Sequence, residues 1–175
     1  MSNPNERAFK PLKIAVMTVS DTRTEATDKS GDTLVKLLTE AGHELAEKRI
    51  VPDDIYQIRA AVSQWIADDS LNAVITTGGT GITGRDTTPE AVSALFDKQI
   101  DGFGELFRAL SYEEINTSTM QSRAVAGVAN ATFLFCLPGS TGACRTGWGK
   151  IISHQLDYRT RPCNLVELMP RVLEK

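Results

Sequence analysis

Residues 73–90, with the sequence AVITTGGTGITGRDTTPE, contain the pattern that decides the fold. The short β-branched run Ala73–Thr76 predicts a buried strand, and the glycines that follow it prevent its continuation. Thr88-Pro89 then predicts a helix N-cap followed by proline at the first helical position. We therefore expect this segment to run from a strand through a glycine-rich loop into a helix.

The loop itself has the composition of an anion-binding site. Its glycines allow positive φ angles and a close approach of backbone N–H groups to a ligand, and the helix start adds a partial positive charge. Arg85 contributes a cation and Asp86 a carboxylate. Because a carboxylate alone would repel phosphate, the combination indicates a bridging Mg²⁺.

Strands and helices alternate on both sides of this segment. The predicted strands are Lys13–Val19, the more polar and therefore edge-like His43–Val51, and Ala131–Leu137. Apolar spacing predicts a helix through Leu34 to Ala41, with Ser30 or Asp32 upstream and Gly42 after its end. A second helix is predicted from Ile55, and Asp53 or Asp54 could cap it. A short helix is expected within Ile100–Ile115, and one carrying Trp148 to Leu156 is capped by Ser140 or Thr141. This alternation indicates an α/β fold with a mostly parallel central sheet and helices on both faces, with ligands at the carboxyl ends of the strands.

Length and composition limit the class of protein. The 175 residues predict a single domain, 1–175, with residues 1–11 as a flexible arm. A net charge of -3 argues against general nucleic-acid binding, and no stretch is apolar enough to span a membrane. Three cysteines without C-x-x-C spacing favour the reducing cytoplasm.

Other strand ends carry polar residues that could face the same ligand. Ser20-Asp21 follows the first strand and Asp53-Asp54 the second, although either pair could simply cap. One of the two neighbouring aspartates could join Asp86 at the metal. Ser118, Ser122 and Arg123 are either a solvated loop or an oxyanion pocket built from hydroxyls and a guanidinium.

Two familiar phosphate motifs fit the loop poorly. Gly79–Gly84 satisfies G-x-G-x-x-G, but Arg85-Asp86 delays the helix that should receive a pyrophosphate. The same dipeptide replaces the Lys-Ser/Thr of a P-loop. A thiol nucleophile is also disfavoured, because Cys144 and His154 lie about 15 Å apart on one predicted helix.

Three motifs in order resemble the MoaB/Mog family of molybdenum-cofactor biosynthesis, and its MoaB branch most closely. They are Thr76-Thr77-Gly78-Gly79-Thr80-Gly81 followed by Arg85-Asp86-x-Thr88-Pro89-Glu90-Ala91, then Ser122-Arg123-Ala124-x-Ala126-Gly127, then Leu137-Pro138-Gly139-Ser140. The resemblance runs from about Lys13 to Tyr158 and extends to the gephyrin G domain. It implies a three-layer α/β sandwich, a homo-trimer or a hexamer made of two trimers, and transfer of AMP from Mg-ATP to molybdopterin. It also implies other proteins of the same pathway as partners.

The resemblance assigns roles by motif position. Asp53 and Asp86 are implied as the catalytic and Mg²⁺-binding acids, with the glycine loop and Ser140 near a phosphate of the nucleotide or pterin. With the residues singled out above, the predicted substrate-binding set is Ser20, Asp21, Gly78, Gly79, Thr80, Gly81, Arg85, Ser118, Ser122, Arg123, Pro138, Gly139 and Ser140.

Two alternatives to an adenylyltransferase stay open. Thr141 follows Ser140 where many Mog-type members have proline, which leaves a non-catalytic molybdopterin-binding or scaffold protein as the competing hypothesis. A nucleotide-dependent oxidoreductase is the third, and it predicts tight NAD binding.

Overall fold

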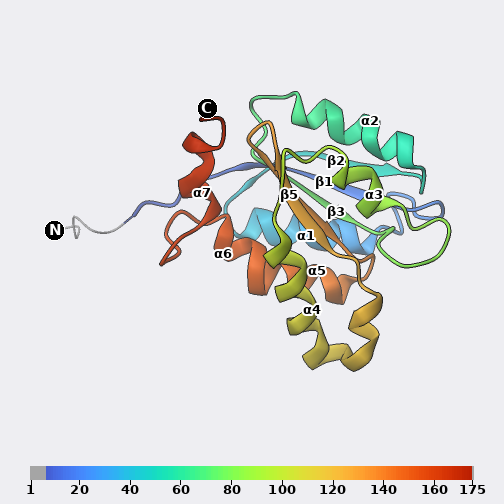
Figure 1. Cartoon of the computed structure of the whole chain (residues 1–175). Helices are drawn as coiled ribbons and strands as arrows, with labels where there is room; N and C mark the ends of the chain where they lie inside the picture. The colour runs from blue at the N-terminus through green and yellow to red at the C-terminus, as the bar shows by residue number, and fades with distance from the viewer. Residues whose placement is uncertain (1–6, 175) are drawn as a thin grey trace.

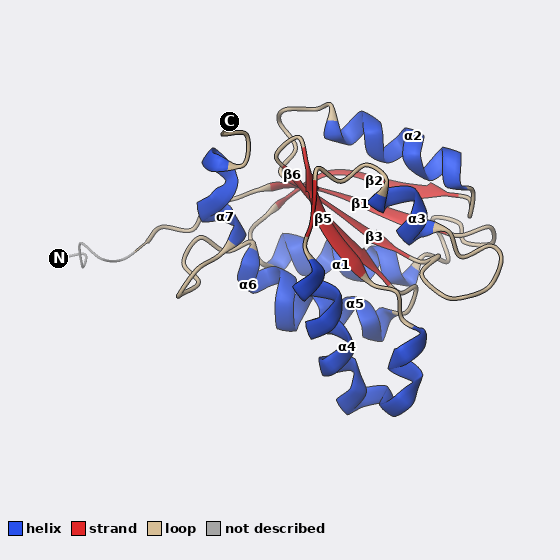
Figure 2. Ribbon diagram, viewed as in Figure 1, coloured by secondary structure: helices blue, strands red, loops and turns tan. Residues whose placement is uncertain are grey.

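The computed structural model describes residues 7–174, and a six-stranded sheet forms its central layer (Figures 1 and 2). The strands are β1 (Lys13–Val19), β2 (Glu44–Val51), β3 (Ala73–Thr77), β4 (Lys98–Gln99), β5 (Val125–Ala129) and β6 (Thr132–Leu137). They lie in the order β2-β1-β3-β6-β5-β4. The first four of these are mutually parallel, whereas β5 is antiparallel to β6 and β4 to β5. The predicted mostly parallel sheet, with the more polar strand β2 at its edge, is confirmed.

Helices cover both faces of the sheet, as the α/β prediction requires (Figure 1). On one face lie α1 (Lys29–Glu40), α4 (Asp101–Ile115) and α5 (Thr141–Gly147), which continues through the π-helix η2 (Trp148–Ile152) into α6 (Ser153–Gln155). On the other lie α2 (Ile55–Ile66) and α3 (Thr88–Ser93). The 3₁₀ helix η1 (Asn116–Gln121) follows α4, and α7 (Leu165–Leu168) and η3 (Met169–Arg171) lie near the C-terminus. Within residues 7–174, each helix is too short or too polar to cross a membrane.

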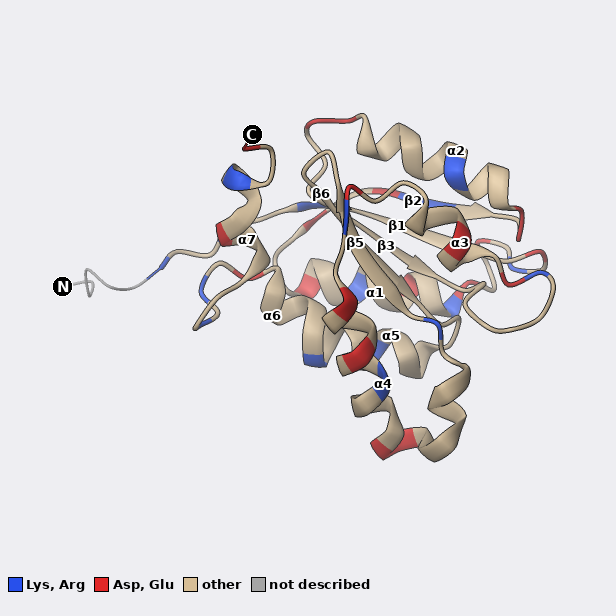
Figure 3. Ribbon diagram, in the orientation of Figure 1, with Lys and Arg blue, Asp and Glu red and all other residues tan. Residues whose placement is uncertain are grey.

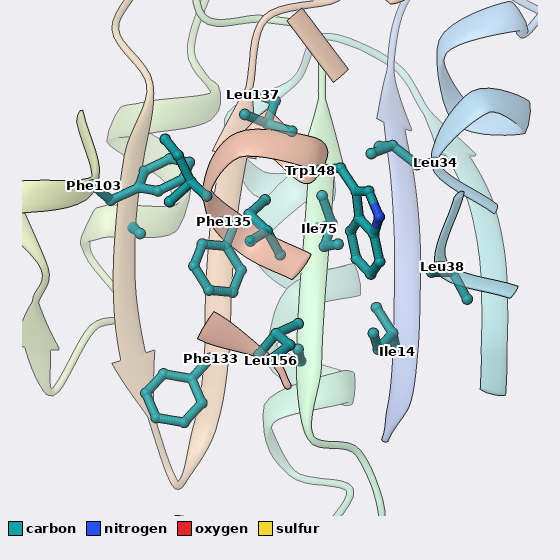
Figure 4. Close-up of a cluster of buried hydrophobic side chains, with 14 of the residues drawn as sticks. Ile14, Leu34, Leu38, Ile75, Phe103, Phe133, Phe135, Leu137, Trp148 and Leu156 are labelled. Carbon is teal, nitrogen blue, oxygen red and sulfur yellow. The ribbon is translucent and has the colours of Figure 1, made fainter. Parts of the chain in front are cut away.

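Alternate residues of each central strand enter two separate cores. In β1, Ile14 and Val16 pack with α1, α4 and α5, whereas Ala15 and Met17 pack with α2 and α3, and all four are fully buried. Figure 4 shows the first core, with side chains from β1, β3 and β6 facing those of the helices. Because a strand covered on both faces has no solvent side, its sequence is apolar at successive positions.

Two helix starts differ from the prediction. The carboxylate of Asp28 caps α1 by accepting a hydrogen bond from the N–H of Gly31 at 3.0 Å, so neither Ser30 nor Asp32 is the cap. Thr88 is the first residue of α3 and not its N-cap, and its hydroxyl donates to the carbonyl of Gly78 at 2.9 Å. The Thr88 side chain therefore ties the start of α3 to the glycine loop.

Helix α4 is longer than the predicted short helix, with 15 residues. The low helix propensity of its glycines is offset by packing, because Phe103 and Phe107 on one face are both buried. Gly104 is required there, since a Cβ at this position would lie 2.5 Å from the carbonyl oxygen of Ala124.

Strand β5 was not predicted from its small residues. A Cβ at Gly127 would lie 2.4 Å from the ring of Phe96, so the absence of a side chain permits a close approach there. Asn130 and Ala131 join β5 to β6 with φ angles of 46° and 64°. Positive φ at both turn residues is the geometry of a two-residue hairpin, which makes β5 antiparallel to β6.

The N-terminal segment contacts two distant parts of the chain from Arg7 onward. Arg7 forms an ion pair with Glu167, and the ring of Phe9 lies 5.1 Å from that of His43. Residues 7–11 therefore contact both the C-terminal segment and the α1–β2 junction, and the flexibility of the predicted arm stays a prediction. Residues 1–6 of that predicted arm lie outside the described residues.

Candidate functional site

A cavity of about 600 Å³ lies at the carboxyl ends of the parallel strands. Its walls come from the loops that follow β1, β2, β3 and β6, together with α4 and η1, which meet on one side of the sheet in Figure 1. Among the residues that line it, the sequence predicted Ser20, Asp53, Gly78, Gly79, Thr80, Gly81, Asp86, Ser118, Ser122, Pro138, Gly139 and Ser140. The volume is in the range of small-molecule sites.

The glycine loop follows β3 in a conformation that larger residues would not adopt. Gly78 and Gly79 have φ angles of +102° and +66°. A Cβ at Gly78 would lie 2.2 Å from the carbonyl oxygen of Val19, and one at Gly79 would lie 2.3 Å from Oγ1 of Thr88. The loop can therefore pass between the end of β1 and the start of α3 only because both positions are glycine.

Two carboxylates lie against this loop. A Cβ at Gly79 would be 3.1 Å from Oδ1 of Asp53, and one at Gly81 would be 2.7 Å from Oδ2 of Asp86. Oδ2 of Asp86 also accepts from the backbone N–H of Thr83 at 2.9 Å and from its hydroxyl at 2.5 Å. The glycines thus leave room for the two acids to face the cavity.

The two acids differ in their electrostatic surroundings. The pKa of Asp86 is lowered, chiefly because the Thr83 hydroxyl donates to its ionised form. The pKa of Asp53 is raised, first because burial disfavours its charge and then because of the negative charge of Asp21, with a smaller effect from Asp86. Neighbouring Asp54 caps α2 by accepting from the N–H groups of residues 56 and 57, so Asp53 is the one that faces the cavity.

Asp21 and Arg85 lie beside the cavity but do not line it. The N–H of Asp21 donates to Oδ2 of Asp53 at 3.0 Å, and the N–H of Asp53 donates to Oδ1 of Asp21 at 3.0 Å. Arg85 donates to the Asp21 carboxylate through Nε at 3.0 Å and Nη2 at 2.7 Å. Asp21 therefore holds Asp53 in place, and Arg85 forms an ion pair with Asp21.

Arg123 braces the glycine loop from behind. Its Nε donates to the carbonyl of Gly81 and its Nη2 to the carbonyl of Asp86, both at 2.7 Å, and Nη1 pairs with Glu90. It lines a second cavity of about 440 Å³ instead of the first. Ser122 lines both cavities, and its buried hydroxyl has no hydrogen-bond partner within the described chain.

The donor set of the first cavity fits a Mg²⁺ ion. Residues 7–174 contain no cluster of three or more His, Cys, Asp and Glu side chains that could hold a metal by themselves. Mg²⁺ does not need such a cluster, because it is usually bound through one or two carboxylates, water and substrate phosphates. Asp53 and Asp86 could supply those carboxylates, and a cation there would favour the ionised form of Asp53, whose pKa is raised by burial and by neighbouring negative charge.

A family model described as "Probable molybdopterin binding domain" matches residues 15–158. Molybdenum cofactor biosynthesis protein B of Escherichia coli K12 is 58% identical over 156 residues, covering 89% of this chain and 92% of the relative. The chain belongs to the MoaB family of molybdenum cofactor biosynthesis. A crystal structure of a molybdenum cofactor biosynthesis protein B superposes on this MoaB family chain with a TM-score of 0.83 at 50% identity, covering 86% of this chain and 94% of that one. The tungsten cofactor synthesizing protein MoaB from Pyrococcus furiosus has a TM-score of 0.75 at 41% identity, with coverages of 84% and 94%.

Several lining residues of this MoaB family member were missed by sequence reasoning. They are Thr18, Thr22, Arg23, Ser30, Phe107, Ser111, Glu114 and Ile115. Thr18 lies in β1 and Ser30 in α1, whereas Thr22 and Arg23 lie in the polar segment between these elements, which has no helical or strand period that would flag them. The others are on α4, and only its position beside the strand ends makes them lining residues.

A buried ion pair supports the β1–α1 side of the cavity. Asp28 is fully buried and accepts from the Thr18 hydroxyl at 2.8 Å and from Nζ of Lys48 at 3.1 Å. The pKa of Asp28 is lowered because its hydrogen bonds and Lys48 outweigh the largest single effect, burial. In this MoaB family chain, the pair holds Thr18 at the cavity wall.

Proposed function

We propose that the chain transfers AMP from ATP to the terminal phosphate of molybdopterin. An oxygen of that phosphate attacks the α-phosphorus, the new P–O bond forms, and the bond from the α-phosphorus to the bridging oxygen breaks. Pyrophosphate leaves with the electron pair of the broken bond, so no oxidant is needed. Such a transfer depends mainly on alignment and charge stabilisation.

The observation that carries the proposal is the pair of carboxylates seated on a glycine loop at the strand ends. Asp53 and Asp86 would hold Mg²⁺, which when bound supplies positive charge to the phosphates of ATP. The Ser122 hydroxyl, which has no partner in the described protein, can donate to a phosphate oxygen. No protein nucleophile is required, and burial raises the pKa of the Cys144 thiol to about 11, which keeps it protonated.

Pyrophosphate release from purified protein, molybdopterin and Mg-ATP tests the proposal. We expect Asp86→Asn and Asp53→Asn to slow release by about 100-fold or more, because each removes a carboxylate that would hold Mg²⁺ at the phosphates. Asp69→Asn is the matched control, since Asp69 is exposed and lies outside the cavity lining. Release that does not depend on molybdopterin, or that D86N leaves unchanged, would contradict the proposal.

A molybdopterin-binding protein without transferase activity is the second candidate. It is favoured by one observation: both arginines expected near the phosphates, Arg85 and Arg123, donate to protein acceptors. Tight molybdopterin binding without pyrophosphate release, and without NAD binding, would support this candidate over the other two.

We also propose that the chain acts in the cytoplasm as a trimer or hexamer, together with other proteins of the pathway. Large apolar side chains on α4 and η1 are exposed and could be covered by another copy: Leu106, Tyr112, Ile115 and Met120. Light scattering after size-exclusion chromatography should give three or six times the chain mass of 19.1 kDa. A monomer at micromolar concentration would contradict this assembly.

A further inference from the structure

The cavity is poor in positive charge for a site that should receive phosphates. Three acidic residues line it, namely Asp53, Asp86 and Glu114. Within residues 7–174, Arg23 is the only Lys or Arg among its lining residues. Figure 3 shows basic and acidic residues interspersed along the ribbon.

The loop after β1 fixes where Arg23 starts. Oγ of Ser20 accepts from the backbone N–H groups of Thr22 at 3.2 Å and Arg23 at 3.1 Å. A turn follows in which the N–H of Thr24 donates to Oγ1 of Thr27 at 2.9 Å. The Arg23 backbone is therefore held at the cavity by its own loop.

The guanidinium of Arg23 keeps most of its hydrogen-bonding capacity. In the described chain, only Nη1 donates to a protein acceptor, the carbonyl of Thr27 at 3.0 Å. By contrast, Arg85 pairs with Asp21, and Arg123 donates to two carbonyls and Glu90. A guanidinium has five N–H donors in a planar fork that matches phosphate.

We propose that Arg23 binds a phosphate group of the ligand in this cavity, either the polyphosphate of ATP or the phosphate of molybdopterin. The choice of these two ligands rests on the proposed function. The single bond to the Thr27 carbonyl limits the rotamers of the long side chain, and the other N–H groups donate to phosphate oxygens. Arg23 then supplies the protein cation that Arg85 and Arg123 do not provide.

Calorimetric titration of Arg23→Met tests the proposal without requiring turnover. The ligands are ATP with Mg²⁺, molybdopterin, and their phosphate-free counterparts adenosine and dephosphorylated molybdopterin. We expect R23M to weaken binding of at least one phosphorylated ligand about tenfold or more, since a charge-assisted contact is lost. Adenosine and dephosphorylated molybdopterin should bind as they do to the wild type. R23K should recover part of the affinity, because it restores charge without the fork.

Arg171→Met is the matched control, because Arg171 is exposed, pairs with Glu174 and does not line the cavity. The ligand that R23M weakens identifies which phosphate Arg23 contacts. Unchanged binding of both phosphorylated ligands, or equal weakening of the phosphate-free ones, overturns the proposal. If the wild type binds molybdopterin but not ATP, adenylyl transfer fails while the molybdopterin titration still decides the role of Arg23. If it binds neither, both proposals are overturned.

Discussion

Replacing Arg123 by glutamine distinguishes a side chain that braces the glycine loop from one that binds ligand. R123Q removes the donors that reach the carbonyls of Gly81 and Asp86 at 2.7 Å, and the ion pair with Glu90. A hydrogen bond from a charged group contributes about 1.5–3 kcal/mol. Because the side chain is 32% exposed, solvent reduces each to roughly 1 kcal/mol. The half-exposed ion pair adds at most ~1 kcal/mol, so we expect the free energy of unfolding to fall by about 2–3 kcal/mol.

Urea denaturation of the wild type, R123Q and Glu90→Gln measures this loss. E90Q removes only the ion pair, so it should cost less than about 1 kcal/mol. Hydrogen exchange should also show faster opening of residues 81–86 in R123Q than in E90Q. If R123Q is as stable as the wild type but binds phosphorylated ligand more weakly, the bracing role is refuted and Arg123 contacts ligand.

Three further perturbations test other parts of the structure. Ala131→Gly should raise the free energy of unfolding in urea by about 0.5–1 kcal/mol, because glycine relieves the positive φ; a decrease would contradict this. Burial lowers the pKa of His43, whose Nδ1 accepts from the N–H of Leu12. His43 therefore binds a proton more readily in the unfolded chain than in the folded one, and the urea midpoint should fall as the pH drops through about 6.5. A pKa of His43 above that value in an NMR titration of the folded protein would argue against this. Asp21→Asn removes a charge that raises the pKa of Asp53, so that pKa should fall in a carboxyl ¹³C titration, and no shift would show that the charge is ineffective.

Local patterns were enough for the strands and the glycine loop beside the cavity. The apolar runs of β1, β3 and β6 are uninterrupted because both faces of each strand are covered, and that signal does not depend on distant residues. The glycines at 78 and 79 marked the loop for the same reason, since their backbone angles are a local requirement. Parallel strands then bring their loops to one edge without further information.

The charges could not be placed from local patterns. Arg85 and Arg123 belong to the quoted motifs, yet their partners, Asp21 and Glu90, lie 64 and 33 positions away. Pairing at that separation depends on the tertiary fold, which a local motif does not encode. Arg23, by contrast, is in a polar stretch without periodicity, and only the position of its loop beside the cavity distinguishes it.

The reciprocal hydrogen bonds between Asp21 and Asp53 link their two loops into one unit. Each residue is both donor and acceptor for the other, so a substitution that removes the side-chain oxygen at either position removes the partner of a backbone N–H at the other. Their effects should be non-additive in a double-mutant cycle. Over evolutionary time, such a pair should change together or not at all, and a lineage that abandons the acid at position 53 loses the constraint that keeps aspartate at position 21.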